Sequence, residues 1–122
     1  MKPESLNVVC LCAEWCGTCR EYRDTFTALQ QALPAHHYRW IDIEDEADLV
    51  GDVDVETFPT LMVTHQDRVL FAGPVLPRLG DAQRLLDTLT EALTRGATPA
   101  AAVAADQAQA YDELARALAL PG

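Results

Sequence analysis

The chain has 122 residues, 49% of them hydrophobic, and a formal net charge of -10 at pH 7. This length suits one compact domain with its own core. The negative charge argues against nucleic acid and anionic membranes as partners, because the attraction that both require would be reversed. The first apolar run is too brief and wrongly flanked for a signal peptide or a membrane span, so we expect a cytoplasmic protein.

The first half of the chain predicts alternating strands and helices. The apolar run Leu6–Cys12 is typical of a buried strand. From Cys16 to Leu33, apolar residues recur every three or four positions, which predicts a helix. A strand over Tyr38–Ile43 and a short helix over Glu46–Val50 follow.

The second half predicts a hairpin and a closing helix. Thr60–His65 and Arg68–Ala72 are expected to be strands joined at Gln66-Asp67. A helix is expected over about Asp81–Arg95, with Asp81 as its N-cap and Gly96 as its stop. This order predicts a parallel strand pair extended by antiparallel strands.

An alanine-rich tract, Ala100–Leu120, ends the chain and places apolar residues on one helical face. We therefore divide the chain into a domain over residues 1–96 and a helical extension over residues 97–122. The simplest role of the extension is a terminal helix that packs on the domain. Dimerisation or partner docking through the same apolar stripe, and a loosely attached tail, are the alternatives.

The segment Trp15-Cys16-Gly17-Thr18-Cys19 stands where the first strand gives way to a helix. Cys16 would lie at the helix N-terminus, where unpaired N–H groups and the helix dipole stabilise the thiolate that attacks disulfides. Cys19 follows one turn later on the same face and can resolve the mixed disulfide. The pair alone is also compatible with half of a zinc site.

Cys10 and Cys12 share one face of the first strand, because side chains alternate along a strand. We interpret both as buried, small apolar side chains, and a disulfide between them is not expected. A metal site formed by all four cysteines is the alternative, although a strand and a helix start would bring these side chains together poorly. We expect neither a metal ion nor a cofactor.

The stretch Ala13–Gly17 resembles the active site of thioredoxins, and Thr57-Phe58-Pro59-Thr60 resembles their cis-proline turn. The resemblance runs from about Leu6 to Arg95. It implies an α/β fold with three layers, α/β/α, around a central mixed sheet. Thioredoxins usually carry another strand and helix before the active-site strand, whereas five residues precede Leu6 here. An N-terminally truncated version would leave the strand Tyr38–Ile43 at the sheet edge and one face bare for the extra C-terminal helix to cover.

The resemblance also implies how substrate is bound. The cis-proline faces the cysteine pair across the substrate groove, the backbone of Phe58 pairs with the incoming peptide, and Trp15 forms one wall of the groove. Gly73 falls where the family carries a glycine after its last strand. The expected substrate-binding residues are Trp15, Gly17, Thr18, Phe58, Pro59 and Gly73. Cys10 occupies the position of a buried aspartate in many thioredoxins, and no obvious general base replaces it.

Acidic residues concentrate between Asp42 and Glu56, where no Lys or Arg occurs. This segment is either a solvated connector or an acidic bank of the substrate groove, which would favour basic or neutral partners.

The expected function is that of a thiol–disulfide oxidoreductase that reduces protein disulfides through Cys16 and Cys19. Its expected partners are a disulfide-containing protein substrate and an electron-donating reductase, and a homodimer is compatible with the C-terminal stripe. The alternative is a binding or assembly factor that uses the groove and the C-terminal helix, with incidental cysteines.

Overall fold

The computed structural model describes residues 5–13, 16–55, 57–66, 68–97 and 99–118. The strands are β1 (Asn7–Cys12), β2 (His37–Asp42), β3 (Thr60–His65), β4 (Arg68–Pro74) and β5 (Ala102–Val103). The helices are α1 (Gly17–Ala32), α2 (Ala47–Val50), α3 (Leu79–Thr94) and α4 (Ala108–Leu118). The order from β1 to α3 is the predicted one.

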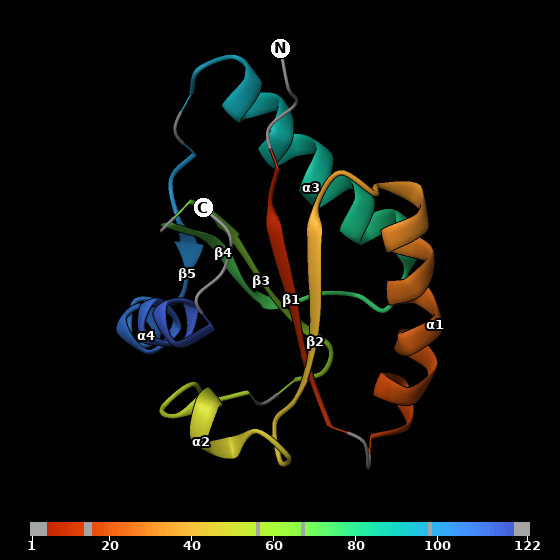
Figure 1. Cartoon of the computed structure of the whole chain (residues 1–122), viewed down its shortest axis with the longest axis vertical. Helices are drawn as coiled ribbons and strands as arrows, with labels where there is room; N and C mark the ends of the chain where they lie inside the picture. The colour runs from red at the N-terminus through yellow and green to blue at the C-terminus, as the bar shows by residue number, and fades with distance from the viewer. Residues whose placement is uncertain (1–4, 14–15, 56, 67, 98, 119–122) are drawn as a thin grey trace.

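The strands form one mixed sheet in the order β2-β1-β3-β4-β5. β1 pairs with β2 in parallel and with β3 in antiparallel, β3 pairs with β4 in antiparallel, and β4 pairs with β5 in parallel. Helices α1 and α3 cover one face, and α2 and α4 cover the other (Figure 1). The three-layer α/β/α fold is therefore confirmed, and β2 lies at an edge of the described sheet, as expected.

β1 is buried on both faces, which is why its sequence shows no polar alternation. Its residues Val8, Cys10 and Cys12 belong to a core shared with α1 and α3, which we call the first core. Val9 and Leu11 point to the opposite face and belong to a second core, shared with α2 and α4. β1 thus carries the cysteines into the interior between the sheet and α1.

The C-terminal tract differs from the single helix predicted over Ala100–Leu120. Its first part forms β5, in which Val103 pairs with Ala72 of β4, and helix α4 starts only at Ala108. An unpaired β4 edge offers backbone hydrogen bonds to an extended segment, and a β-branched residue suits that conformation. The alanine content of the tract does not indicate that part of it can pair with β4.

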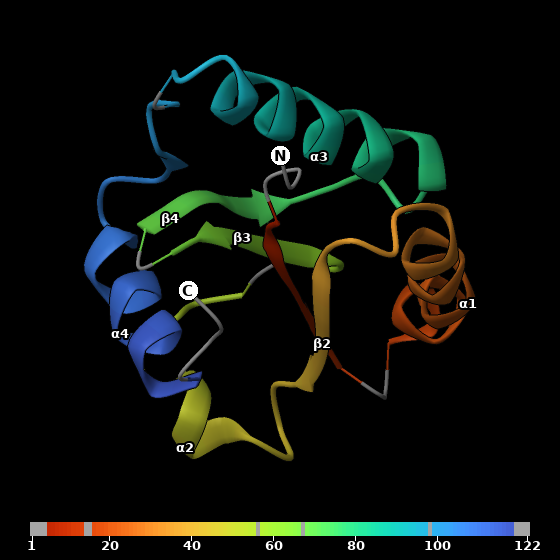
Figure 2. The ribbon, with the colours of Figure 1, turned by 45° about the horizontal axis from the view of Figure 1, so that its top comes forward.

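Helix α4 packs its apolar stripe on the chain's own sheet (Figure 2). Tyr111, Leu114 and Leu118 are buried in the second core with residues of β1, β3 and β4. The simplest of the three roles for the extension is therefore the one observed. The stripe is covered within the chain, so it does not offer a free apolar surface to a second copy or to a partner.

Helix α3 starts two residues earlier than predicted, and its N-cap is Arg78 and not Asp81. Asp81 lies in the first turn, where its carboxylate accepts hydrogen bonds from Arg78 at 3.0 Å and from Arg84 at 2.8 Å. A carboxylate in this turn is favoured by the helix dipole. Gly96 has a φ of +79°, and its N–H donates to the carbonyl of Leu93 at 3.0 Å, so it ends the helix as expected.

His36 holds the residue before β1, because its Nδ1 accepts a hydrogen bond from the Leu6 N–H at 3.0 Å. Burial lowers the pKa of His36 from its ordinary value of 6.5, against an opposing effect of Asp87 and with a small further lowering by His37. A protonated ring cannot accept this bond at Nδ1. The stabilisation is therefore complete above the ordinary pKa and is lost progressively as the pH falls below it.

We expect the free energy of unfolding of the wild type to fall more steeply than that of His36→Gln between about pH 7.5 and about pH 5. Urea denaturation at a series of pH values measures both slopes. His37→Gln, which replaces an exposed ring one residue away, should stay closer to the wild-type slope than His36→Gln does. Equal slopes for the wild type and His36→Gln would show that the hydrogen bond to Leu6 does not contribute to the pH dependence of the free energy of unfolding.

Candidate active site

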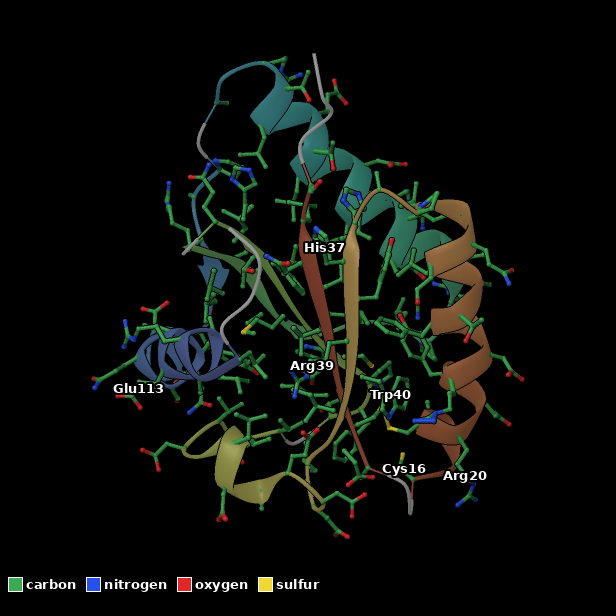
Figure 3. All side chains as sticks on the ribbon, viewed as in Figure 1. Cys16, Arg20, His37, Arg39, Trp40 and Glu113 are labelled. Atoms are coloured by element: carbon green, nitrogen blue, oxygen red, sulfur yellow. A yellow bond between two sulfur atoms is a disulfide. The ribbon has the colours of Figure 1, made fainter. Side chains whose placement is uncertain are left out.

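Cys16 begins helix α1. It is the N-cap residue, with φ -87° and ψ 122°, and its side chain is free and partly exposed. Its N–H donates to the Ala13 carbonyl at 3.0 Å, and its carbonyl accepts from the Arg20 N–H at 3.2 Å. Figure 3 shows Cys16 and Arg20 together at this end of the molecule. The first turn carries no acidic side chain, so a thiolate at Cys16 would face the positive end of the helix dipole without a competing carboxylate in that turn.

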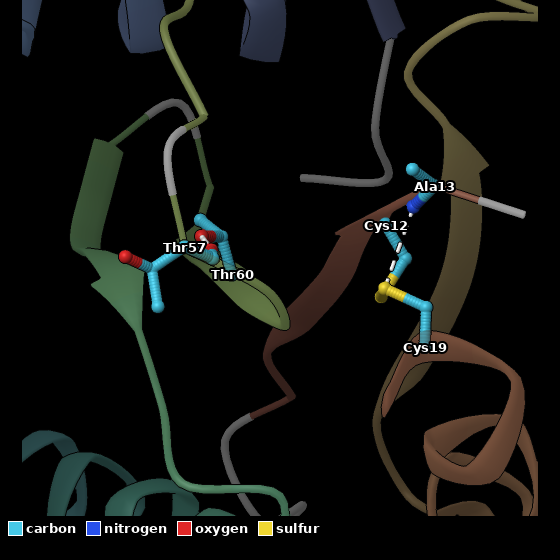
Figure 4. Close-up of a disulfide and its surroundings, with 5 residues drawn as sticks. All are labelled: Cys12, Ala13, Cys19, Thr57 and Thr60. Atoms are coloured by element: carbon cyan, nitrogen blue, oxygen red, sulfur yellow. Dashed lines mark hydrogen bonds between the residues drawn. A yellow bond between two sulfur atoms is a disulfide. The ribbon is translucent and has the colours of Figure 1, made fainter. Parts of the chain in front are cut away.

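Cys19 forms a disulfide with Cys12 (Figure 4). The sequence predicts a redox pair of Cys16 and Cys19 and treats Cys12 as a buried, small apolar side chain, whereas the structure bonds Cys19 to Cys12 and leaves Cys16 free. The Cα atoms of Cys12 and Cys19 are 5.7 Å apart, within the range that a disulfide spans. The end of β1 and the first turn of α1 share the first core, so they bring these two side chains together where we expected poor convergence.

The disulfide is closed off from solvent. Cys12 is 0% exposed and Cys19 is 1% exposed. The backbone N–H of Ala13 donates a hydrogen bond to the sulfur of Cys19 at 3.4 Å. Cys16 is therefore the more accessible of these sulfurs, and the Cys19 sulfur carries a backbone hydrogen-bond donor.

Cys10 is buried and unbonded, as the sequence predicts. Burial raises its pKa far above the ordinary value, and Arg23 opposes this rise only in part. The thiol therefore stays neutral at ordinary pH and cannot replace the missing general base. Within the part of the chain that the structure describes, no group of three or more His, Cys, Asp or Glu side chains is placed to hold a metal ion.

The peptide bond between Phe58 and Pro59 is cis, which is the geometry that the sequence resemblance implies. Pro59 directly precedes Thr60, which pairs with Leu11 in the β1–β3 register. The cis-proline therefore lies beside the end of β1 that carries Cys12.

Two hydrogen bonds fix the cis-proline turn. The Thr60 hydroxyl donates to the Thr57 carbonyl at 2.7 Å, and the Val75 N–H donates to the Pro59 carbonyl at 3.0 Å. Phe58 and Cys16 both pack against the first core. The fold thus brings the predicted nucleophile and the cis-proline turn to one end of the sheet.

The other predicted substrate-binding residues lie in different parts of the fold. Gly17 is exposed and Thr18 is half-buried at the start of α1. Gly73 lies inside β4, opposite Leu61, and not after the last strand. It lines a cavity of about 280 Å³ that also touches the cis-proline turn and α4. Trp15 lies outside the described residues.

A larger cavity, of about 410 Å³, opens beside Cys19. Its lining is Ala13, Cys19, Arg20, Arg23, Trp40, Asp42 and Asp45. The Arg23 guanidinium stacks over the Trp40 ring, 4.9 Å from its centroid. The acidic bank that the sequence suggests includes the two aspartates but not Arg23 and Trp40. The position of Arg23, one helical turn after Cys19, is the only sequence signal for this part of the cavity.

The described helices include none whose length and apolar content would suffice to cross a membrane.

The sequence matches the model of the Thioredoxin family over residues 1–74. This match covers more than half of the chain, and the chain belongs to the thioredoxin family.

Similar proteins carry the same family name. A Streptomyces coelicolor protein provisionally named thioredoxin 2 is 29% identical over 80 residues, which cover 60% of each chain. The chain thus spans about three fifths of the length of that relative.

Solved structures share the fold. Thioredoxin-2 of a malaria parasite, a component of its protein secretion machinery, superposes with a TM-score of 0.63 at 19% identity, covering 72% of this chain and 85% of its own. Thioredoxin f2, crystallised with ferredoxin:thioredoxin reductase, gives a TM-score of 0.61 at 14% identity, covering 70% of this chain and 77% of its own.

Proposed function

We propose that the protein is a thiol–disulfide oxidoreductase that reduces protein disulfides, with Cys16 as its nucleophile. The observation that carries the proposal is the position of the Cys16 sulfur. It is free and partly exposed at the N-cap of α1, whereas Cys10, Cys12 and Cys19 are buried. A helix N-terminus favours the thiolate, which is the form that attacks a disulfide.

The reaction proceeds by two exchanges. The Cys16 thiolate attacks one sulfur of the substrate disulfide, which forms a mixed disulfide and releases the first substrate thiolate. The Cys19 thiolate, which the Ala13 N–H would stabilise, then attacks the Cys16 sulfur and releases the second. Pro59 and the backbone of Phe58 position the peptide beside these sulfurs.

The oxidised protein then needs an electron donor. Thioredoxin f2 was crystallised with a reductase, and a partner of that class would return two electrons to this chain in the cytoplasm. Asp42 and Asp45 line the cavity beside Cys19, and they favour a client or donor that presents basic or neutral groups there.

Replacement of the resolving cysteine tests the proposal. Cys19→Ser should accumulate a mixed disulfide with a disulfide substrate such as insulin, because Cys16 still attacks but its thiol partner is gone. Non-reducing gels and mass spectrometry detect the adduct. The matched control, Cys16→Ser combined with Cys19→Ser, should form none, and an equal yield from both variants would overturn the assignment of Cys16.

A further inference from the structure

We propose that Cys12 is a third redox-active cysteine, which takes over the Cys19 sulfur after each turnover and frees Cys16. The inference rests on the proposed function and goes beyond the two-cysteine cycle. Its basis is that Cys19 has two possible sulfur partners. It is bonded to Cys12 in the structure, and it lies three residues after Cys16 on α1, where side chains are neighbours.

The step is an internal exchange that needs no outside oxidant or reductant. The Cys12 thiol loses its proton, and its thiolate attacks the Cys19 sulfur of the Cys16–Cys19 disulfide. The bond between Cys12 and Cys19 forms as the bond between Cys16 and Cys19 breaks. Cys16 leaves as a thiolate and takes up the proton, so the number of electrons in the protein does not change.

Burial and the helix dipole favour the Cys12–Cys19 form. In the Cys16–Cys19 form the leftover thiol is that of Cys12, which is 0% exposed within the first core, where negative charge is costly. In the Cys12–Cys19 form the leftover thiol is that of Cys16, partly exposed at the start of α1, where negative charge is stabilised. The oxidised protein would thus keep a nucleophile at its surface.

Access imposes an order on the steps. Cys12 and Cys19 are 0% and 1% exposed, so a protein disulfide cannot reach either sulfur directly. Oxidation of this pair by a protein must pass through Cys16. This requirement separates a relay from a structural disulfide, which would form without Cys16.

The linkage map of the oxidised protein tests the relay. The reduced wild type is oxidised with insulin, alkylated under native conditions, and digested for mass spectrometry. We expect a Cys12–Cys19 linkage and rapid alkylation of Cys16 alone. Oxidised Cys12→Ala should instead carry a Cys16–Cys19 linkage and lose the rapidly alkylated thiol. The control Cys10→Ala, which replaces a buried cysteine of the same strand face, should keep the wild-type map.

Two results would overturn the relay while leaving the proposed function intact. One is a Cys16–Cys19 linkage with a free Cys12 in the oxidised wild type. The other is formation of Cys12–Cys19 from insulin in Cys16→Ser at the wild-type rate, since we expect a loss of about 100-fold or more. The proposed function itself would fail if the wild type did not reduce insulin. That result would not depend on which disulfide a small-molecule oxidant forms in the protein.

Discussion

Replacement of Cys16 by serine should lower the rate of insulin reduction by roughly 1000-fold or more, because the hydroxyl that replaces the thiolate is not a nucleophile toward disulfides at neutral pH. The sulfur of Cys16 is both free and partly exposed. The measurement is the initial rate of insulin precipitation with dithiothreitol as electron donor, corrected for the rate without protein.

Cys10→Ala is the matched control for this loss. Cys10 is also free, but it is fully buried and neutral, so its replacement should leave a rate close to that of the wild type. A Cys16→Ser protein that reduces insulin as fast as Cys10→Ala would rule out the assigned nucleophile. Circular dichroism of both variants establishes that a lost rate is not lost folding.

Leu114→Ala should lower the free energy of unfolding by about 2–4 kcal/mol, the usual cost of removing a buried leucine side chain from a packed core. Leu114 is 1% exposed and lies in the second core, between α4 and the sheet. The measurement is urea denaturation followed by circular dichroism. The loss would establish that the C-terminal helix is part of the folding unit.

The neighbouring residue on α4 provides the control. Glu113 is exposed and projects away from the sheet (Figure 3), so Glu113→Ala should change the free energy of unfolding by no more than about 0.5 kcal/mol. A Leu114→Ala protein as stable as Glu113→Ala would mean that α4 does not hold the second core together.

The sequence predicts the framework of this fold well because its signals are local. The apolar run of β1, the helical periodicity of α1 and α3, and the hairpin of β3 and β4 each depend on neighbouring residues. The N-cap position of Cys16 follows from the same signals, because a strand and a helix meet there. The cis geometry at Pro59 comes instead from the resemblance, since nothing local in Thr57-Phe58-Pro59 requires it.

The rest depends on contacts between distant elements. The Cys12–Cys19 bond requires the end of β1 to pack against the first turn of α1, and side-chain alternation along β1 says only that Cys12 faces that helix. β5 forms because β4 has an edge to pair with, which the composition of the alanine-rich tract does not encode. The cavity beside Cys19 likewise joins α1 to β2 and to the segment after it.

The sulfur that first joins the substrate decides whether Cys16 is the nucleophile. Wild-type protein is mixed with insulin, quenched in acid within the first turnover, and digested for mass spectrometry without reduction. The proposed mechanism predicts insulin peptides linked to Cys16. Insulin peptides linked first to Cys12 or Cys19 would contradict it.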